Sequence, residues 1–414
     1  MKIVLSSRGS RGNVTPVIEI ASELKSRGHN VTLCVPDFFD EQARIKGIQP
    51  VLYKEDSEQI MKNMGSGWKH AANALYWFSQ SINEQFDYML SETKEADALV
   101  TSANELAAPT VAEYRNIPHY RIAGNPVLPG NQPPPLLPLQ GLPDFANRIF
   151  WKLLNDSAGL FIRRLLDKKR KELHLQPIGS IADYFTQNSR TLLIINKELS
   201  PECPSWKSRY RYRYTGYCYR NMNGRLNPEV KSFIQSGEKP VYIGLGSVSI
   251  KNPDRFTDIV YKASLKSGTR IILEEGWAGL GNGRRNENIL IVRDTPHSLL
   301  FPFMSAIIHH GGCGTTHTAA RAGIPQLVLP QIADQYYWAH RVSKLGLGPD
   351  PFNPNKITAD KLTSILIDLK HNKNYRLNAD SLAIMMKDED GSSEAADAIE
   401  KWKIREKKPT HADL

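Results

Sequence analysis

The residues with the clearest capacity for chemistry form one short run, His309-His310-Gly311-Gly312-Cys313-Gly314-Thr315-Thr316. Apolar residues precede the run at 305–308 and small residues follow it at 318–322, which predicts a strand, a glycine-rich turn and a helix. Glycines let backbone N–H groups come close to a ligand, and the first N–H groups of a helix are unpaired and partly positive. The run therefore predicts a diphosphate site, because a structural turn needs neither a histidine pair nor a threonine pair.

Three further pairs of residues flank this run. Gly246-Ser247 ends an apolar run at 241–245, Pro296-His297 opens a short helix, and Asp334-Gln335 follows the apolar run at 325–330. Ligands of open α/β sheets bind at the carboxyl ends of strands, which is where Gly246-Ser247 is expected.

Strands and helices must alternate to position these residues, and the chain shows that alternation. Segments at 2–6, 14–25 and 30–35 predict a βαβ unit, and 414 residues exceed one comfortable core. We expect an α/β fold of two domains with parallel, doubly wound sheets. The expected divisions are an N-terminal domain at 1–215, a linker at 216–238, a second domain at 239–391, and a last helix with a polar tail at 392–414.

Two N-terminal segments are candidates for binding an acceptor molecule. Residues 67–95 are aromatic and helical and include Trp77 and Phe78, which either line an acceptor cleft or pack in the core. Residues 125–144 contain seven prolines, beginning with Pro126, and cannot lie inside a sheet. Such a long loop is usually functional or mobile, so it is either a wall or lid of the acceptor site or a plain surface loop.

The run HHGGxGTT, followed by RAGIPQLVLP and then DQ, resembles the donor-binding signature of GT-B glycosyltransferases of the UDP-glycosyltransferase type. The resemblance is nearest to the sterol glucosyltransferase and glycopeptide glycosyltransferase group. It implies a GT-B fold, with two Rossmann-like domains whose parallel sheets face each other across a cleft. The C-terminal domain then holds a nucleotide sugar, the N-terminal domain holds the acceptor, and the last helix packs back on the N-terminal domain.

The resemblance also implies a role for individual residues of the predicted donor site. Pro296 and His297 lie beside the pyrimidine base, and Asp334 and Gln335 bind sugar hydroxyls. The diphosphate is bound by a larger group of residues, of which His310 contacts it directly. This group is Ser247, His310, Gly312, Gly314, Thr315 and Thr316. Arg11 and Gly12, in the N-terminal motif, complete the donor side. Plant members carry a ribose-binding Glu where this chain has Thr318, so the choice between UDP and TDP stays open.

The N-terminal motif of the group reads GSRGDVxP, and here it reads GSRGNVTP. The family's Asp or His at this position acts as general base on the acceptor hydroxyl, whereas the amide of Asn13 cannot take up a proton. Another side chain then serves as base, with Asp37, His70 and His119 as candidates, or the acceptor is acidic enough for Asn13 only to orient it. In the third alternative, the protein binds a nucleotide sugar without fast turnover.

Charge and composition narrow the expected partners. Net charge is +10, and basic residues cluster at 163–171, 207–213 and 401–408. These clusters are expected either to contact a membrane surface or to be solvated faces of helices. No nucleic-acid motif accompanies them. Asp388-Glu389-Asp390 is interpreted as surface charge, so neither a metal nor another cofactor is expected.

The sequence carries no sign of export. It has no apolar run of about 18 residues, and its apolar start is too short for a signal peptide. Four scattered cysteines show no metal-binding spacing. We therefore expect reduced thiols in a cytoplasmic protein, and no pattern indicates an oligomeric state.

The expected activity is inverting, metal-independent transfer of a sugar, glucose first, from UDP or TDP to a hydroxyl of a sterol, polyketide, phenol or similar hydrophobic molecule. A UDP-sugar 2-epimerase is not expected to carry HHGGxGTT with its flanks. A dinucleotide oxidoreductase is disfavoured, since the 9–12 segment lacks the full GxGxxG. An auxiliary protein that binds a nucleotide sugar remains the alternative, because of Asn13.

Overall fold

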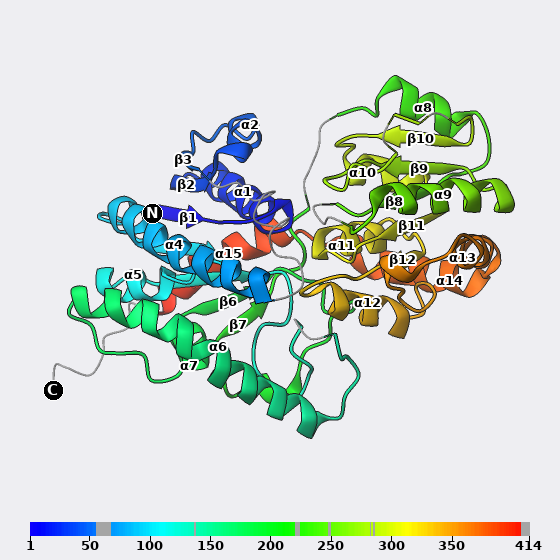
Figure 1. Cartoon of the computed structure of the whole chain (residues 1–414). Helices are drawn as coiled ribbons and strands as arrows, with labels where there is room; N and C mark the ends of the chain where they lie inside the picture. Colours follow the sequence, from blue (N-terminus) through cyan, green and yellow to red (C-terminus); the bar gives the residue numbers. More distant parts are fainter. Residues whose placement is uncertain are drawn as a thin grey trace.

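The computed structural model of the chain describes residues 1–54, 68–135, 138–219, 224–246, 250–281, 283–284 and 286–406, with side chains throughout except at 68–78, 157–158 and 403–406. The described chain forms two α/β domains that lie side by side (Figure 1). None of the described helices combines the length and the apolar character needed to cross a membrane. All four cysteines are buried free thiols.

The N-terminal domain is built on a parallel sheet with the strand order β3-β2-β1-β4-β5-β6-β7 in the described chain. The strands are β1 (Lys2–Ser6), β2 (Asn30–Pro36), β3 (Val51–Tyr53), β4 (Ala98–Ser102), β5 (His119–Ala123), β6 (Arg190–Leu193) and β7 (Tyr212–Tyr214). Helices cover both faces, and so a central strand such as β1 is a continuous apolar run in which Ile3, Val4 and Leu5 are fully buried.

The helices of this domain alternate with its strands. They are α1 (Arg11–Ser26), α2 (Asp40–Ile45), α4 (Trp68–Glu92), α5 (Ala108–Arg115), α6 (Asp144–Glu172) and α7 (Ile181–Gln187), with short 3₁₀ turns η1 (Asp37–Phe39) and η2 (Pro204–Trp206). α1 begins in the expected glycine-rich motif, and Pro16 lies inside the helix, where it supplies no N–H for the carbonyl four residues before it.

The C-terminal domain has a second parallel sheet, with the described order β10-β9-β8-β11-β12. The strands are β8 (Val241–Gly244), β9 (Ile271–Glu274), β10 (Ile289–Val292), β11 (Ala306–His309) and β12 (Gln326–Val328). The helices are α8 (Pro228–Gln235), α9 (Pro253–Ser267), α10 (His297–Leu300), α11 (Cys313–Arg321), α12 (Gln335–Lys344), α13 (Ala359–His371) and α14 (Lys373–Met386), with 3₁₀ turns η3 (Phe301–Phe303) and η4 (Pro354–Lys356). These two sheets confirm the expected fold class.

Helix α8 lies within the range expected to link the domains. Its Val230, Phe233 and Ile234 pack in one apolar cluster with Ile272 of β9 and Leu300 of α10. Asn227 caps the helix by accepting a hydrogen bond from the N–H of Glu229. α8 is thereby part of the C-terminal domain's own packing.

The two domains share one apolar cluster at their seam. Leu193 and Trp206 come from the N-terminal domain, Tyr217 from the connection, and Trp338 from the C-terminal domain. Beside them, His317 of α11 accepts a hydrogen bond from the backbone N–H of Asn196 at 3.1 Å. The seam is therefore packed and hydrogen-bonded like a domain interior.

The last helix, α15 (Gly391–Glu406), packs against α1 of the N-terminal domain. Ala395 and Ile399 are fully buried in the same cluster as Leu5. Arg27 of α1 binds Asp397 through Nη1 and Oδ1 at 2.7 Å. The chain thus passes between the domains twice, once before α8 and once before α15 (Figure 1).

Candidate functional site

Strand β11 ends at His309, and this side chain holds the turn that follows. His309 is fully buried, and its Nδ1 accepts a hydrogen bond from the Gly311 N–H at 3.1 Å. Its proton is therefore on Nε2, which donates to Gln326 Oε1 at 3.0 Å. Burial, with a smaller contribution from His310, lowers the pKa of His309 to about 3. The ring is neutral at pH 7 and has no nitrogen left for a ligand.

The next residue, His310, has its ring between two glycines. A Cβ on Gly246 would lie 2.7 Å from its Cε1, and a Cβ on Gly312 would lie 2.5 Å from its Nε2. Burial lowers the pKa of His310 to about 4, with Glu274 opposing and His297 adding to the effect. Its Nδ1 is buried and has no hydrogen-bond partner among the described residues. A neutral imidazole with an unused nitrogen is suited to bind one oxygen of a ligand.

Helix α11 starts directly after this turn. Its N-cap is Gly312, which has no side chain to bond the first N–H groups, so these groups keep a partial positive charge. Thr315 is partly exposed here, whereas Thr316 is buried and its Oγ1 donates to the Gly312 carbonyl at 2.9 Å. A Cβ on Gly314 would lie 2.5 Å from the hydroxyl of Tyr217. Of the two threonines, Thr315 therefore keeps its hydroxyl proton available for a ligand.

A buried cluster surrounds His297, the first residue of α10. The Tyr242 hydroxyl donates to Glu274 Oε2 at 2.5 Å and lies 2.9 Å from His297 Nε2, so its oxygen accepts the proton of that nitrogen. The His297 ring stacks on Phe301, with centroids 4.4 Å apart. Burial raises the pKa of Glu274, but His297 and Tyr242 together outweigh it and hold this pKa below its usual value. The cluster fixes the ring of His297 next to Pro296.

On the other side of the turn, Asp334 and Gln335 begin helix α12. Burial raises the pKa of Asp334, although hydrogen bonds from Asn125 and Trp338 partly offset this. The Trp338 contact is 3.3 Å between Nε1 and Oδ2. Gln335 is buried, and its Oε1 accepts two backbone N–H bonds at 2.8 and 3.1 Å. Asn125 follows β5 of the N-terminal domain, so this end of the site already contains a residue of each domain.

A second contact joins the two sheet edges at the opposite end of the site. Arg11, in the first turn of α1, binds Asp294 through Nη1 and Oδ1 at 2.6 Å. Asp294 follows β10 and has a φ of 48°, a backbone conformation that is unusual for a residue other than glycine. The guanidinium of Arg11 also lies 5.4 Å from the ring centre of Phe38. The carboxyl ends of the two sheets therefore face each other.

Comparisons with known proteins agree with this arrangement. Residues 3–128 match the family model of the glycosyltransferase family 28 N-terminal domain, and residues 275–401 match that of the erythromycin biosynthesis protein CIII-like C-terminal domain. Glycosyltransferase GtfE of Amycolatopsis orientalis is 30% identical over 407 residues, covering 96% of this chain and 97% of that protein. The chain belongs to the GT-B glycosyltransferases.

Two further similarities define how far this relationship extends. Sterol 3-beta-glucosyltransferase UGT80A2 of Arabidopsis thaliana is 28% identical over 421 residues, covering 96% of this chain. The chain spans only 65% of the length of that plant protein. The crystal structure of the glycosyltransferase of kitacinnamycin has the same fold, with a TM-score of 0.75 at 19% identity, covering 96% of this chain and 98% of that one.

The predicted acceptor side has two amides, and one of them, Asn13, stands where the resembling family carries a base. Asn13 is exposed on the first turn of α1, next to the exposed Gly12. A Cβ built on Gly9 would lie 3.0 Å from Nδ2 of Asn13 and 3.3 Å from Nδ2 of Asn104. Two side-chain amides thus stand together beyond the ends of β1 and β4. They can orient a hydroxyl but cannot remove its proton.

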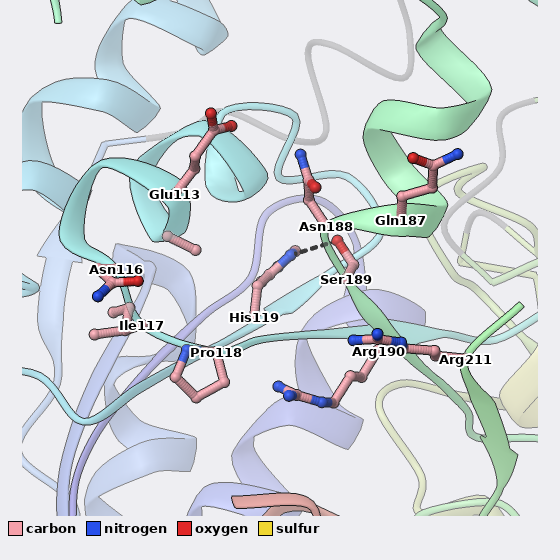
Figure 2. Close-up of a pocket in the computed structure, with 11 residues that line it drawn as sticks. Glu113, Asn116, Ile117, Pro118, His119, Gln187, Asn188, Ser189, Arg190 and Arg211 are labelled. Carbon is pink, nitrogen blue, oxygen red and sulfur yellow. Dashed lines mark hydrogen bonds between the residues drawn. The ribbon is translucent and has the colours of Figure 1, made fainter. Parts of the chain in front are cut away.

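The three candidate bases fall in different places. His119 is the first residue of β5, so it lies at the amino ends of the strands, away from the predicted donor residues. It lines a pocket of ≈ 360 Å³ together with Arg190 (Figure 2). Its Nδ1 lies 2.7 Å from Ser189 Oγ and its Nε2 lies 2.9 Å from Thr101 Oγ1, and burial lowers its pKa to about 3. His119 is therefore excluded as the base.

The other two candidates differ from His119. Asp37 is exposed and follows the carboxyl end of β2, next to the Phe38 that Arg11 contacts, which makes it a carboxylate on the correct edge of the sheet. The side chain of His70 lies outside the described residues. The same holds for Ser247 and for the side chains of Trp77 and Phe78, whose predicted roles stay predictions. Pro126 is described, and it is buried.

Sequence reasoning missed two buried carboxylates that lie at or just after the carboxyl ends of described strands. Glu274 ends the apolar strand β9, and a carboxylate at the carboxyl end of a buried strand is a signal that was available. Glu105 is 2% exposed and accepts hydrogen bonds from Ser6 Oγ at 2.7 Å and the Tyr88 hydroxyl at 2.8 Å. Glu105 lies near Arg8. Burial lowers the pKa of Arg8, but Glu105 and its other acidic neighbours outweigh burial and raise this pKa above its usual value.

One sequence interpretation was wrong in part. Glu389, in the run interpreted as surface charge, is half-buried at the domain seam. Its Oε1 accepts from Asn196 Nδ2 at 2.9 Å, and its Oε2 accepts from the Tyr219 hydroxyl at 3.0 Å. The neighbours Asp388 and Asp390 are exposed, as expected. Short-range pattern could not show that the middle residue of the run faces another domain.

Proposed function

We propose that this glycosyltransferase moves a sugar, with inversion at the anomeric carbon and without a metal ion, from a UDP- or TDP-sugar to a hydroxyl of a hydrophobic small molecule. The observation that carries the proposal is the convergence of the His310 ring and the first N–H groups of α11 at the carboxyl edge of the C-terminal sheet. Neutral and partly positive donors at one point favour a diphosphate.

The site supports an order of base, diphosphate and sugar along this edge. His297, held by Tyr242 and Glu274, faces the nucleobase in this proposal. His310 and the start of α11 bind the diphosphate, and Asp334 and Gln335 bind the sugar. Asp334 is bonded to Asn125 of the N-terminal domain, so the sugar is placed where the two domains meet.

The reaction requires attack of the acceptor oxygen on the anomeric carbon from the side opposite the diphosphate. The new C–O bond forms while the bond to the diphosphate breaks, and the acceptor proton goes to a base. Negative charge grows on the departing diphosphate, where preorganised donors such as His310 and the α11 N–H groups stabilise it. Attack comes from the N-terminal side, where Asn13 and Asn104 stand.

The hydrophobic acceptor and glucose as the sugar are supported by the relatives. One of them bears the name sterol 3-beta-glucosyltransferase, and it matches 96% of this chain. Asp37 is the described carboxylate best placed to act as base, and Asn13 is assigned the orientation of the acceptor hydroxyl.

A donor-and-acceptor screen tests the proposal. The protein is incubated with UDP- and TDP-glucose and with sterols, phenols and polyketides, and release of the nucleoside diphosphate is measured with and without EDTA. We expect release that depends on the acceptor and is unaffected by EDTA. Absence of release with every pair overturns the proposed transfer, and loss of activity in EDTA overturns its metal independence.

The alternative is an auxiliary protein that binds a nucleotide sugar with little turnover, and the amide of Asn13 favours it. Calorimetry separates the two. Tight binding of a nucleotide sugar with no transfer to any acceptor supports the auxiliary role, whereas binding with turnover supports the enzyme.

A further inference from the structure

Helix α6 leaves an apolar stripe uncovered on the outside of the N-terminal domain. Phe145, Ile149, Leu153 and Leu160 are between 54% and 62% exposed, and their spacing of four, four and seven residues keeps them on one face. Leu139, in the preceding loop, is 56% exposed. Single exposed apolar residues are ordinary, but several of them along one face of a helix mark an interaction surface.

Basic side chains border this stripe. Arg148, Lys152, Arg163 and Arg164 are all exposed on the same helix, which carries eight basic against four acidic residues. Arg148 Nη1 donates to the uncharged Asn131 Oδ1 at 3.3 Å. Among these four, Arg163 has an acidic neighbour, Asp167, at 3.6 Å. Asp156 interrupts the stripe, so the face is amphipathic and not uniformly apolar.

The opposite side of α6 fixes the helix firmly to the domain. Leu166 is fully buried in an apolar cluster, and Arg170 forms a two-pronged ion pair with Glu113 at 2.8 and 3.0 Å. At the other end, Asn147 Nδ2 donates to two backbone carbonyls, and Trp151 Nε1 donates to the Gln132 carbonyl at 2.9 Å. The exposed stripe therefore belongs to a firmly packed helix, and α6 runs along the outer edge of the N-terminal domain (Figure 1).

We propose that this face of α6 docks the protein on an anionic lipid bilayer. An amphipathic helix with apolar residues on one side and Lys or Arg beside them lies in the plane of a membrane interface, with its apolar side chains among the acyl chains and its cations at the headgroups. The basic border selects an anionic lipid surface over an uncharged apolar partner.

The docking surface is connected to the predicted sugar site. The loop that precedes α6 is bonded to the helix through Asn147 and Trp151, and its first residue, Asn125, bonds Asp334. A bilayer under α6 thus lies next to a wall of the proposed acceptor site. This consequence rests on the proposed function, whereas the docking itself does not.

The test is co-flotation of the full chain with vesicles of phosphatidylcholine alone or with a third phosphatidylglycerol. We expect binding to the anionic vesicles that weakens as salt is raised. Ile149→Gln with Leu153→Gln reduces the partition coefficient by about tenfold or more. Lys152→Gln with Arg164→Gln removes the preference for anionic lipid. The matched control is Leu377→Gln with Ile384→Gln on α14, at 63% and 76% exposure, which leaves binding unchanged.

Three results overturn the proposal. These are failure of the wild-type chain to float with anionic vesicles, flotation of the α6 variant as well as the wild type, and equal loss of binding by the α14 control. Sedimentation velocity tests whether a second copy of the chain occupies the stripe instead. If the wild type is a dimer that does not bind vesicles, and the α6 variant is a monomer, the stripe serves self-association. Transfer to a water-soluble acceptor, measured in parallel, separates failure of docking from failure of the proposed function.

Discussion

The two halves of the site are built in opposite ways. On the C-terminal side, His309, His310 and Tyr242 are buried or nearly so, and hydrogen bonds or close glycines fix their positions. On the N-terminal side, Asn13 and Asp37 are exposed. In the proposed function, the diphosphate is the same in every donor, so the residues that bind it can be part of the core. An acceptor-facing surface of exposed side chains can change without disturbing folding.

The strongest test of this contrast is His310→Ala. It removes the imidazole that the close glycines accommodate, and we expect kcat/KM to fall by about 10²–10³-fold, with nucleotide-sugar affinity reduced in calorimetry. His371→Ala, an exposed histidine at the end of α13, is the control and leaves both unchanged. Unaltered affinity in the His310 variant contradicts the assignment of the diphosphate site.

On the acceptor side, Asn13→Asp restores the residue type of the family without changing side-chain size. If Asp37 does not serve as the base and the site lacks only that group, kcat rises by about 10²-fold, and the gain disappears as pH falls through the titration of the new carboxylate. Asn374→Asp introduces the same charge on an exposed amide in the first turn of α14, away from the site, and leaves kcat within about twofold. A fall in kcat for Asn13→Asp shows instead that the amide itself is required.

Histidine burial on the donor side predicts acid sensitivity. Burial lowers the pKa of His317 to about 4, although its hydrogen bond to the Cys313 carbonyl opposes the shift. Below pH 6.5 the unfolded chain takes up a proton that the folded chain excludes until about pH 4. As pH is lowered through this window, the free energy of unfolding therefore decreases, by about 1.4 kcal/mol per pH unit for one such histidine.

His317→Gln isolates that contribution. At pH 7 the variant is less stable by about 1–3 kcal/mol, because it removes the buried imidazole ring that stacks on Tyr217 and contacts Trp338 at the domain seam. Between pH 6.5 and 5 its disadvantage shrinks, as measured by urea unfolding. His371→Gln is the control. Parallel stability curves for wild type and His317→Gln contradict the prediction.

The smallest effect is expected from Arg11→Ala. The Arg11–Asp294 pair joins the two halves, but its side chains are 42% and 73% exposed, and exposed ion pairs contribute little. We expect the donor KM to change by less than about threefold and the effect to vanish at high salt. Lys2→Ala, which breaks the exposed pair with Glu95 elsewhere, is the control. A loss comparable to that of His310→Ala means that the halves are not separable.

Much of the fold was predictable because it is local in the sequence. Buried parallel strands are continuous apolar runs, and the HHGGxGTT turn is a single segment, so both the fold class and the family followed from short stretches. The Tyr242–Glu274 contact joins neighbouring strands across 32 positions, and Arg11 reaches Asp294 across 283. The apolar side chains of α8 have meaning only against β9. A sequence pattern shows which residues have the same chemical character, but it does not show which of them are in contact in the folded protein.

The return of α15 to the N-terminal domain has a consequence for synthesis on the ribosome. The cluster that contains Leu5 of the first strand is not complete until α15 adds Ala395, Ala396, Ala398 and Ile399. At about 5–20 residues per second, roughly 10–40 s pass between emergence of β7 and emergence of α15. Throughout that interval the apolar side of α1 stays open to water. A nascent chain therefore exposes a ready binding site for chaperones until its last helix arrives, and a truncation that removes α15 leaves that site open permanently.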